Sequence, residues 1–140
     1  MQRKAFLKTS CSLCLLASAG FVLSTITSCA PYSIYKTTLK ENQISVPISS
    51  FAKSSLLLVR AQEVEFDIAL RKEKDGTYTA LLLKCTHGEN TLFSTGNSFE
   101  CTLHGSKFDT HGDAIKGPAI HPLKKFKTQL TDDKIIIFIR

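Results

Sequence analysis

The sequence has no segment with the periodicity of a long helix, no internal repeat and no low-complexity tract. It has no run of lysine or arginine interleaved with stacking aromatic residues, which makes nucleic-acid binding a poor interpretation. With 140 residues, it also lacks the length for a second, catalytic domain. These absences leave one small domain, built from strands, with a short additional segment.

The N-terminus carries much of the positive charge. Formal net charge is +6, and three of the 18 basic residues, Arg3, Lys4 and Lys8, lie at the very start. The stretch from Cys11 to Ile26 is apolar but diluted by Ser, Thr and Gly. It is too short and too polar for a comfortable membrane-spanning helix. Residues 1–28 therefore predict an export signal peptide.

The end of this segment, Ile26-Thr27-Ser28-Cys29, resembles a bacterial lipobox. The resemblance implies cleavage before Cys29 and lipidation of its thiol, which anchors the protein to a membrane. An uncleaved signal anchor is the alternative. Both place the domain outside the cytoplasm, facing the periplasm or the outer side of a bacterial membrane.

The first residues also resemble a twin-arginine signal, a route that exports folded proteins with their cofactors. Arg3-Lys4-Ala5-Phe6-Leu7-Lys8 matches that pattern, except that Lys4 replaces the second arginine. General secretion stays open as the other route.

Past the signal, residues 29–43 contain Pro31 and several polar residues and predict a tether. Residues 44–140 predict a small antiparallel β-sandwich or barrel. Turns are expected at Asp75-Gly76, at residues 95–97 and at Asp132-Asp133. The expected strands around them are 44–50, 55–60, 64–73, 77–84, 91–94, 98–100, 126–130 and 135–139.

Two short boxes carry the chemistry. The first is Cys85-Thr86-His87-Gly88, and the second starts at Cys101 and continues through His104 to Asp109. Each box supplies one thiol and one imidazole and follows a predicted strand, so the intervening hairpin brings the boxes together. Two cysteines and two histidines suit a metal site, either an iron–sulfur cluster or tetrahedral zinc.

The boxes resemble the pattern C-x-H, spacer, C-x-x-H-G-S-x-[YF]-D of the Rieske family, over residues 44–140. Gly117-Pro118-Ala119 is similar to that family's Pro loop. The resemblance implies one [2Fe–2S] cluster per chain, with the cysteines on one iron and the histidines on the other. It also implies a fold with two cluster loops and a covering Pro loop, and one-electron transfer.

Three departures from the family pattern stand out. The spacer between His87 and Cys101 is shorter than usual. Asn90 and Leu103 occupy the positions where quinol-oxidising members have a second, disulfide-bonded cysteine pair. Ser106 matches the family's serine near the sulfides, but Phe108 replaces a tyrosine whose hydroxyl donates to a cysteine sulfur. Loss of that donor predicts a reduction potential below that of high-potential Rieske proteins.

Three functions stay open at this point. The first is a membrane-anchored, exported electron carrier in a quinol- or cytochrome-linked respiratory chain. The second is a ferredoxin-type component or small subunit that donates electrons to an oxygenase or oxidase. The third is a non-redox lipoprotein with a structural zinc site. All three favour an electron-transfer protein, subunit or binding protein over a stand-alone enzyme.

Overall fold

The computed structural model describes residues 32–140, so the predicted export signal and Cys29 lie outside the described residues. Eleven strands and one short 3₁₀ helix make up this part of the chain. They are β1 (Ser33–Thr37), β2 (Gln43–Pro47), η1 (Ile48–Phe51), β3 (Leu56–Ala61), β4 (Ile68–Lys72), β5 (Tyr78–Leu82), β6 (Phe93–Ser94), β7 (Phe99–Glu100), β8 (Lys107–Phe108), β9 (Ala114–Lys116), β10 (Lys125–Leu130) and β11 (Lys134–Phe138).

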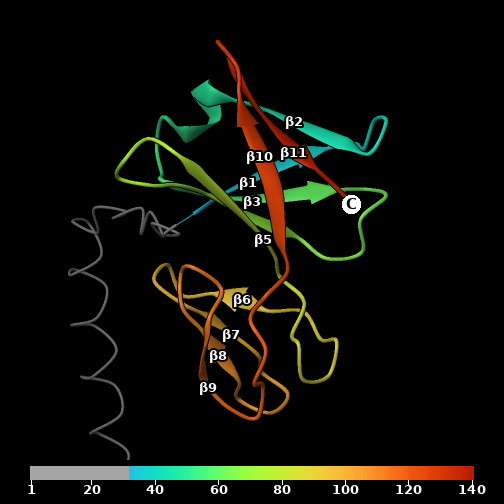
Figure 1. Ribbon diagram of the computed structural model, residues 1–140, viewed down its shortest axis with the longest axis vertical. Coiled ribbons are helices and arrows are strands. Elements are labelled where there is room, and N and C mark those ends of the chain that lie inside the picture. Colours follow the sequence, from blue (N-terminus) through green and yellow to red (C-terminus); the bar gives the residue numbers. More distant parts are fainter. Residues whose placement is uncertain (1–31) are drawn as a thin grey trace, which may run out of the picture.

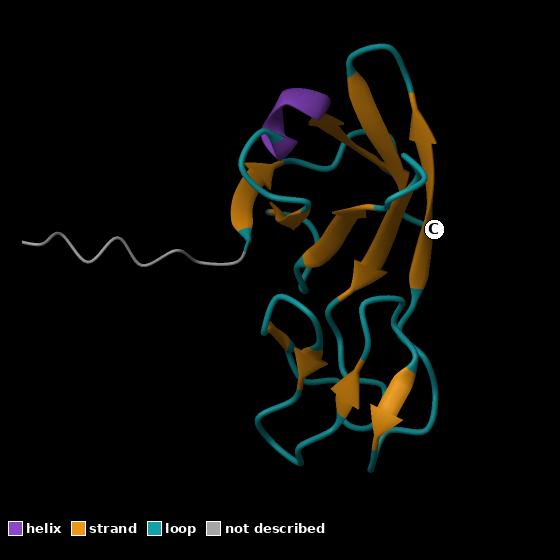
Figure 2. Cartoon of the chain, turned by 90° about the vertical axis from the view of Figure 1, so that its left-hand side faces the viewer, coloured by secondary structure: helices purple, strands orange, loops and turns teal. Residues whose placement is uncertain are grey.

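The strands form two sheets, which lie one above the other in Figures 1 and 2. The larger sheet has seven strands in the order β1-β3-β4-β5-β10-β11-β2. The smaller sheet has four very short strands in the order β6-β7-β8-β9. The predicted class, all-β with a sandwich or barrel and a separate loop-rich subdomain, is confirmed.

The central strands β3, β4 and β5 are buried on both faces, which explains their unbroken apolar runs. Alternate residues point to opposite sides of a strand, so one run serves two cores. One core lies within the seven-stranded sheet and includes Leu57, Ile68 and Leu70. The other core includes Leu58 and Leu81, together with residues of the smaller sheet. The large sheet is thereby the platform on which the small one packs.

The predicted turns are confirmed where they join strands. Gly76 adopts a φ of 85° between β4 and β5, a conformation that glycine tolerates. The carboxylate of Asp75 accepts hydrogen bonds from the backbone N–H of Thr77 at 2.9 Å and from its hydroxyl at 2.7 Å. Asp132 and Asp133 separate β10 from β11, as expected.

Strands β1, β8 and β9 are not among the expected strands, and the 3₁₀ helix η1 replaces the end of the expected strand 44–50. Strand β1 lies inside the segment predicted as a tether, and it pairs in parallel with β3, from Ser33 opposite Leu57 to Thr37 opposite Ala61. This segment alternates half-buried and exposed residues, a weak signal that its polar composition obscures. Strand β4 begins at Ile68, four residues later than the expected strand at 64. No helix within residues 32–140 is long and apolar enough to cross a membrane.

Candidate metal centre

The first box forms a closed loop after β5. Its base is an isolated antiparallel bridge between Lys84 and Thr91. Inside the loop, the backbone N–H of Cys85 donates to the carbonyl of Asn90 at 2.7 Å, and the N–H of Glu89 donates to the carbonyl of Cys85 at 2.9 Å. Glu89 takes a left-handed φ of 56° to close the turn. These bonds fix the backbone on both sides of the intervening residues 86–88.

The second box forms a loop of the same design. Its base is the antiparallel pair of Glu100 and Lys107, in strands β7 and β8. The N–H of Cys101 donates to the carbonyl of Ser106 at 2.9 Å, and the N–H of Gly105 donates to the carbonyl of Cys101 at 3.0 Å. Gly105 has a left-handed φ of 75°, in the same region as the φ of 56° that Glu89 has in the first loop.

The two loops are therefore a structural repeat, of which the sequence shows only part: each box begins with Cys-Thr and contains His-Gly. In both loops, a cysteine comes first, the same two backbone hydrogen bonds close the turn, and a residue with a left-handed φ precedes the last position. The spacing differs, because His87 is the second residue after its cysteine whereas His104 is the third after its own. The shared hydrogen-bond pattern is made by main-chain groups, and the sequence pattern does not predict it.

The two thiols lie together in the interior. Cys85 and Cys101 are free and only 1% and 3% exposed. Burial by itself raises the pKa of Cys85. Backbone N–H groups of His87 and Gly88, the thiol of Cys101 and the hydroxyl of Ser106 outweigh burial and hold this pKa below its ordinary value. A thiol prepared for ionisation is what a metal ligand requires.

The two imidazoles lie together at the surface. His87 and His104 are exposed, and their ring centroids are 5.0 Å apart at an interplanar angle of 86°. Within residues 32–140, no three or more His, Cys, Asp or Glu residues are arranged to hold a single metal ion. The four predicted ligands are instead paired, thiol with thiol and imidazole with imidazole. This donor set suits a binuclear cluster with chemically different ends.

Ser106 and Phe108 lie in the interior near the two cysteines. Both are fully buried. The Ser106 hydroxyl accepts a hydrogen bond from the N–H of Ala119 at 3.1 Å and contacts the thiol of Cys85. Because the hydroxyl oxygen already accepts, its own proton is free to point at sulfur. Phe108 packs in the core that contains both cysteines and offers no donor.

A third segment, residues 117–121, packs beside the two loops. The Gly117-Pro118 peptide bond is cis, and both residues are exposed. Ala119 is buried at 5% exposure in the core that holds both cysteines, whereas Ile120 is 81% exposed. The hydroxyl of Thr86 donates to the carbonyl of residue 121 at 2.7 Å, across 35 positions of sequence. Sequence reasoning missed this bond, because no local pattern identifies a partner so far away.

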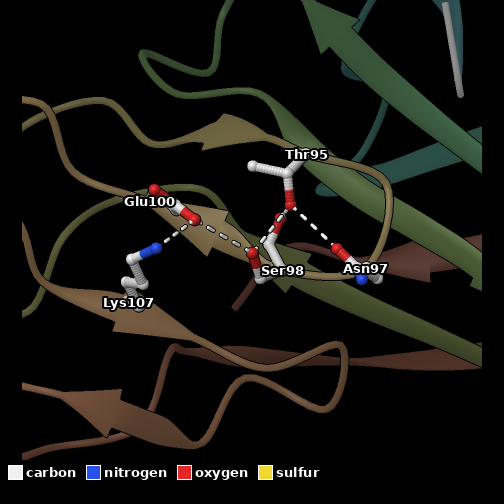
Figure 3. Close-up of polar contacts among 5 residues, drawn as sticks. All are labelled: Thr95, Asn97, Ser98, Glu100 and Lys107. Atoms are coloured by element: carbon white, nitrogen blue, oxygen red, sulfur yellow. Dashed lines mark hydrogen bonds and ion pairs between the residues drawn. The ribbon is translucent and has the colours of Figure 1, made fainter.

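The shortened hairpin between the boxes is held by a polar network (Figure 3). Thr95 and Ser98 share a hydroxyl–hydroxyl hydrogen bond of 2.7 Å, and Ser98 reaches Glu100 at 3.3 Å. Lys107 pairs with Glu100 at 2.8 Å, and this hydrogen bond lowers the pKa of the Glu100 carboxyl. Arg71 of the large sheet donates to the carbonyl of Gly96 at 2.9 Å, which ties the hairpin tip to β4.

Comparison with known families identifies the domain. The family model for the Rieske [2Fe-2S] domain matches residues 43–127, which include both boxes and β2 to β9. The chain belongs to the Rieske [2Fe–2S] domain family. It therefore has one [2Fe–2S] cluster as its cofactor.

Curated relatives of this Rieske protein include iron-sulfur subunits of the cytochrome b6-f complex. It is 36% identical over 66 residues to the cytochrome b6-f complex iron-sulfur subunit of Chlorobaculum thiosulfatiphilum, covering 46% of this chain and 36% of the relative. It is 32% identical over 111 residues to iron-sulfur subunit 2 of the cytochrome b6-f complex of Trichormus variabilis, covering 71% of this chain and 60% of the relative. The chain thus spans about a third to three fifths of these relatives.

The fold of this Rieske protein is also found in solved structures. The crystal structure of the cyanobacterial plasma membrane Rieske protein from Synechocystis PCC 6803 superposes with a TM-score of 0.57 at 22% identity. The match covers 67% of this chain and 97% of the other. At this identity, the likeness supports the shared fold and nothing finer.

Proposed function

We propose that Cys85 and Cys101 bind one iron of the Rieske cluster and that His87 and His104 bind the other. The observation that carries this proposal is the sorting of the four side chains on two equivalent loops. The thiols are buried and touch each other, and the imidazoles are exposed and touch each other. A mononuclear tetrahedral zinc site requires its donor atoms around one point. Within residues 32–140, no three His, Cys, Asp or Glu side chains are grouped in that way.

The bound cluster supplies one-electron chemistry, and histidine ligation raises its potential above that of all-cysteine clusters. The surrounding protein residues determine how negative charge on the cysteine sulfurs is stabilised and how far water is excluded from them. Backbone N–H groups of His87 and Gly88 point at the Cys85 sulfur and stabilise negative charge there. Ser106 adds a hydroxyl donor from the same side. Buried Phe108 excludes water from the sulfur end without donating a hydrogen bond.

The exposed histidine edge is proposed as the docking face for the redox partner. Two exposed apolar residues belong to the neighbouring segments: Leu103, which precedes His104, at 58% exposure, and Ile120, next to the residue that bonds to Thr86, at 81% exposure. Exposed apolar side chains on these segments suit a quinol headgroup or the contact surface of a redox protein. The relationship to cytochrome b6-f subunits supports a quinol- or cytochrome-linked chain as the setting.

We also propose that Cys29 is lipidated after export and holds the domain at the outer face of a bacterial membrane. The lipobox-like Ile26-Thr27-Ser28-Cys29 supports this proposal. Only three residues separate Cys29 from the start of β1 at Ser33. The domain would then lie close to the lipid surface, where a membrane complex can reach it. Labelling with a lipid precursor, compared between the parent and Cys29→Ala, tests the anchor.

A second candidate is a ferredoxin-type component that serves an oxygenase or oxidase. Two observations favour it: Phe108 in place of a hydroxyl donor, and Asn90 and Leu103 in place of the second cysteine pair. Both features suit a lower potential. The midpoint potential separates the two candidates, because a quinol-linked centre requires a value in the upper part of the range for such clusters.

Electron paramagnetic resonance (EPR) of the dithionite-reduced protein, with iron and acid-labile sulfide analysis, tests the ligand proposal. We expect a rhombic [2Fe–2S] signal in the parent and its loss in Cys85→Ser and His104→Ala. A colourless protein that contains zinc and no sulfide would support the structural zinc site and overturn the proposal.

A further inference from the structure

The two ligand loops are not joined to each other by a covalent bond within residues 32–140. Cys85 and Cys101 are free, and Asn90 and Leu103 occupy the positions of the family's second cysteine pair. The backbone bonds that close each loop stay inside that loop. Something else must hold the loops at a fixed separation if two thiols and two imidazoles are to meet one cluster.

The segment 117–121 makes this connection, because it bonds to both loops. The N–H of Ala119 donates to the buried hydroxyl of Ser106, at the end of the second loop. Two residues further on, the carbonyl of His121 accepts from the hydroxyl of Thr86 in the first loop. The side chain of Ala119 packs in the core that contains both cysteines.

Thr86 lies in the first loop between its two proposed ligands, Cys85 and His87. The structural repeat offers an internal comparison, because Thr102 follows Cys101 exactly as Thr86 follows Cys85. Both threonines are exposed in turns. Among residues 32–140, the hydroxyl of Thr86 has a bond to another segment at 2.7 Å, whereas Thr102 has no side-chain hydrogen bond. Threonine at the equivalent position thus makes a hydrogen bond to another segment in the first loop and makes none in the second.

We propose that Thr86 is a positioning residue whose hydroxyl fastens the first ligand loop to the segment 117–121, so that this segment joins the two loops where no disulfide does. The inference rests on the proposed ligand assignment. Breaking the Thr86 bond leaves Ala119 tethered to one loop only. The segment 117–121 then separates from the first loop more often. Water and small chelators thereby reach the buried sulfur atoms of Cys85 and Cys101, beside which Ala119 and Ser106 are also buried.

The test compares Thr86→Val, Thr86→Ser and Thr102→Val in the cluster-loaded protein. Valine keeps the shape of threonine and removes the hydroxyl, and serine keeps the hydroxyl. The first measurement is the rate at which the cluster loses iron to a ferrous chelator, bathophenanthroline disulfonate. The second is amide hydrogen exchange of peptides that cover residues 117–121, which reports opening of the segment without any redox step.

We expect Thr86→Val to accelerate iron loss and exchange in 117–121 by about threefold to tenfold, the effect of one neutral hydrogen bond. Thr86→Ser and Thr102→Val should behave like the parent. If Thr86→Val does not retain a cluster while the other two variants do, the proposal is equally supported. Equal rates in Thr86→Val and the parent would overturn it, and so would equal acceleration in Thr86→Val and Thr102→Val.

The outcome is separable from that of the ligand proposal. A parent that binds no [2Fe–2S] cluster refutes the ligand assignment on its EPR spectrum alone. The exchange comparison of Thr86→Val with Thr102→Val then still decides whether the hydroxyl fastens residues 117–121, because that bond is between protein atoms.

Discussion

The two sheets of this protein reach their structure by different means. All seven strands of the large sheet have five or six residues, as β3 (Leu56–Ala61) and β11 (Lys134–Phe138) illustrate, whereas β6, β7 and β8 have two residues each. The large sheet encloses a core of aliphatic side chains such as Ile44, Leu70 and Ile137, all 0% exposed. The core that the small sheet shares with the large one contains leucines as well, but it also holds Cys85 and Cys101.

The difference shows how stability and function are divided within the domain. Burial of aliphatic side chains stabilises the large sheet without any cofactor. The small sheet has little ladder bonding of its own, and its loops are shaped by turn bonds around the proposed ligands. A cluster that bridges both loops contributes binding free energy to folding of this half. We therefore expect a single substitution to change stability and cluster binding differently, depending on which of the two sheets it affects.

Removing a ligand should produce the largest difference. We expect Cys101→Ser to abolish the [2Fe–2S] EPR signal and to accelerate amide exchange throughout residues 84–123. The large sheet should keep its slow exchange in β2 and β11, because their buried side chains all lie in the core that excludes the cysteines. Hydrogen exchange with mass spectrometry measures both halves in one sample. Global unfolding of the variant would show that the large sheet depends on the cluster. It would contradict the claim that the large sheet is stable without a cofactor.

The converse change targets the large sheet. Leu70→Ala removes a fully buried side chain from its core and should lower the free energy of unfolding by about 2–5 kcal/mol. The EPR signal of the folded variant should match the parent, since Leu70 faces away from the core with the cysteines. Chemical denaturation followed by circular dichroism gives the stability. A changed EPR spectrum at temperatures where the variant is folded would contradict the separation of the two cores.

A smaller effect is expected on the midpoint potential of the cluster when Phe108, in the small sheet, is replaced. Phe108→Tyr restores a hydroxyl next to the thiols, and a hydrogen bond to sulfur stabilises the reduced, more negative cluster. One such bond should raise the midpoint potential by about 20–60 mV, the equivalent of one neutral hydrogen bond in a one-electron couple. Potentiometric titration followed by EPR measures the shift. Phe99→Tyr is the control, because Phe99 is buried in the same core on the neighbouring strand. An equal shift in both variants would rule out a specific bond.

The smallest effect is expected at the β4–β5 turn of the large sheet. Hydrogen bonds from the Thr77 hydroxyl and N–H lower the pKa of Asp75 from its ordinary 3.8. A lowered pKa means that the ionised carboxyl stabilises the fold above pH 3.8 and that this contribution disappears as pH falls through the lowered value. Asp75→Ala should therefore reduce the melting temperature slightly at pH 7, and the gap from the parent should close on acidification. The comparison is made in the Cys101→Ser background, where acid loss of the cluster cannot interfere. A gap that stays constant with pH would show that the carboxylate charge is irrelevant.

The sequence predicts those parts of the protein that local chemistry determines. The turn at Asp75-Gly76 follows from residues with strong turn preferences, and the apolar runs around Leu57, Ile68 and Leu81 predict buried strands. The Rieske family and its cluster follow from two boxes whose spacing few other sites share, and the family match confirms them. The specific ligand roles of the four residues stay predictions.

The rest depends on contacts between distant segments, for which a single sequence holds no signal. The parallel pairing of β1 with β3 joins Ser33 to Leu57, and the Thr86 bond to residue 121 crosses from one loop to another. The hydrogen-bond pattern that the loops 85–90 and 101–106 share is also absent from the sequence signal, because main-chain groups alone make these bonds. Glu89 illustrates the point: it fills a left-handed position that Gly105 fills in the other loop.

Pulsed EPR of the reduced protein, labelled with ¹⁵N at histidine, tests the central claim most directly. If His87 and His104 bind the same iron, the electron spin of the reduced parent protein couples to two inequivalent histidine nitrogens. A reduced cluster with no histidine coupling would contradict the account, since the imidazoles that meet at the surface would then not be ligands.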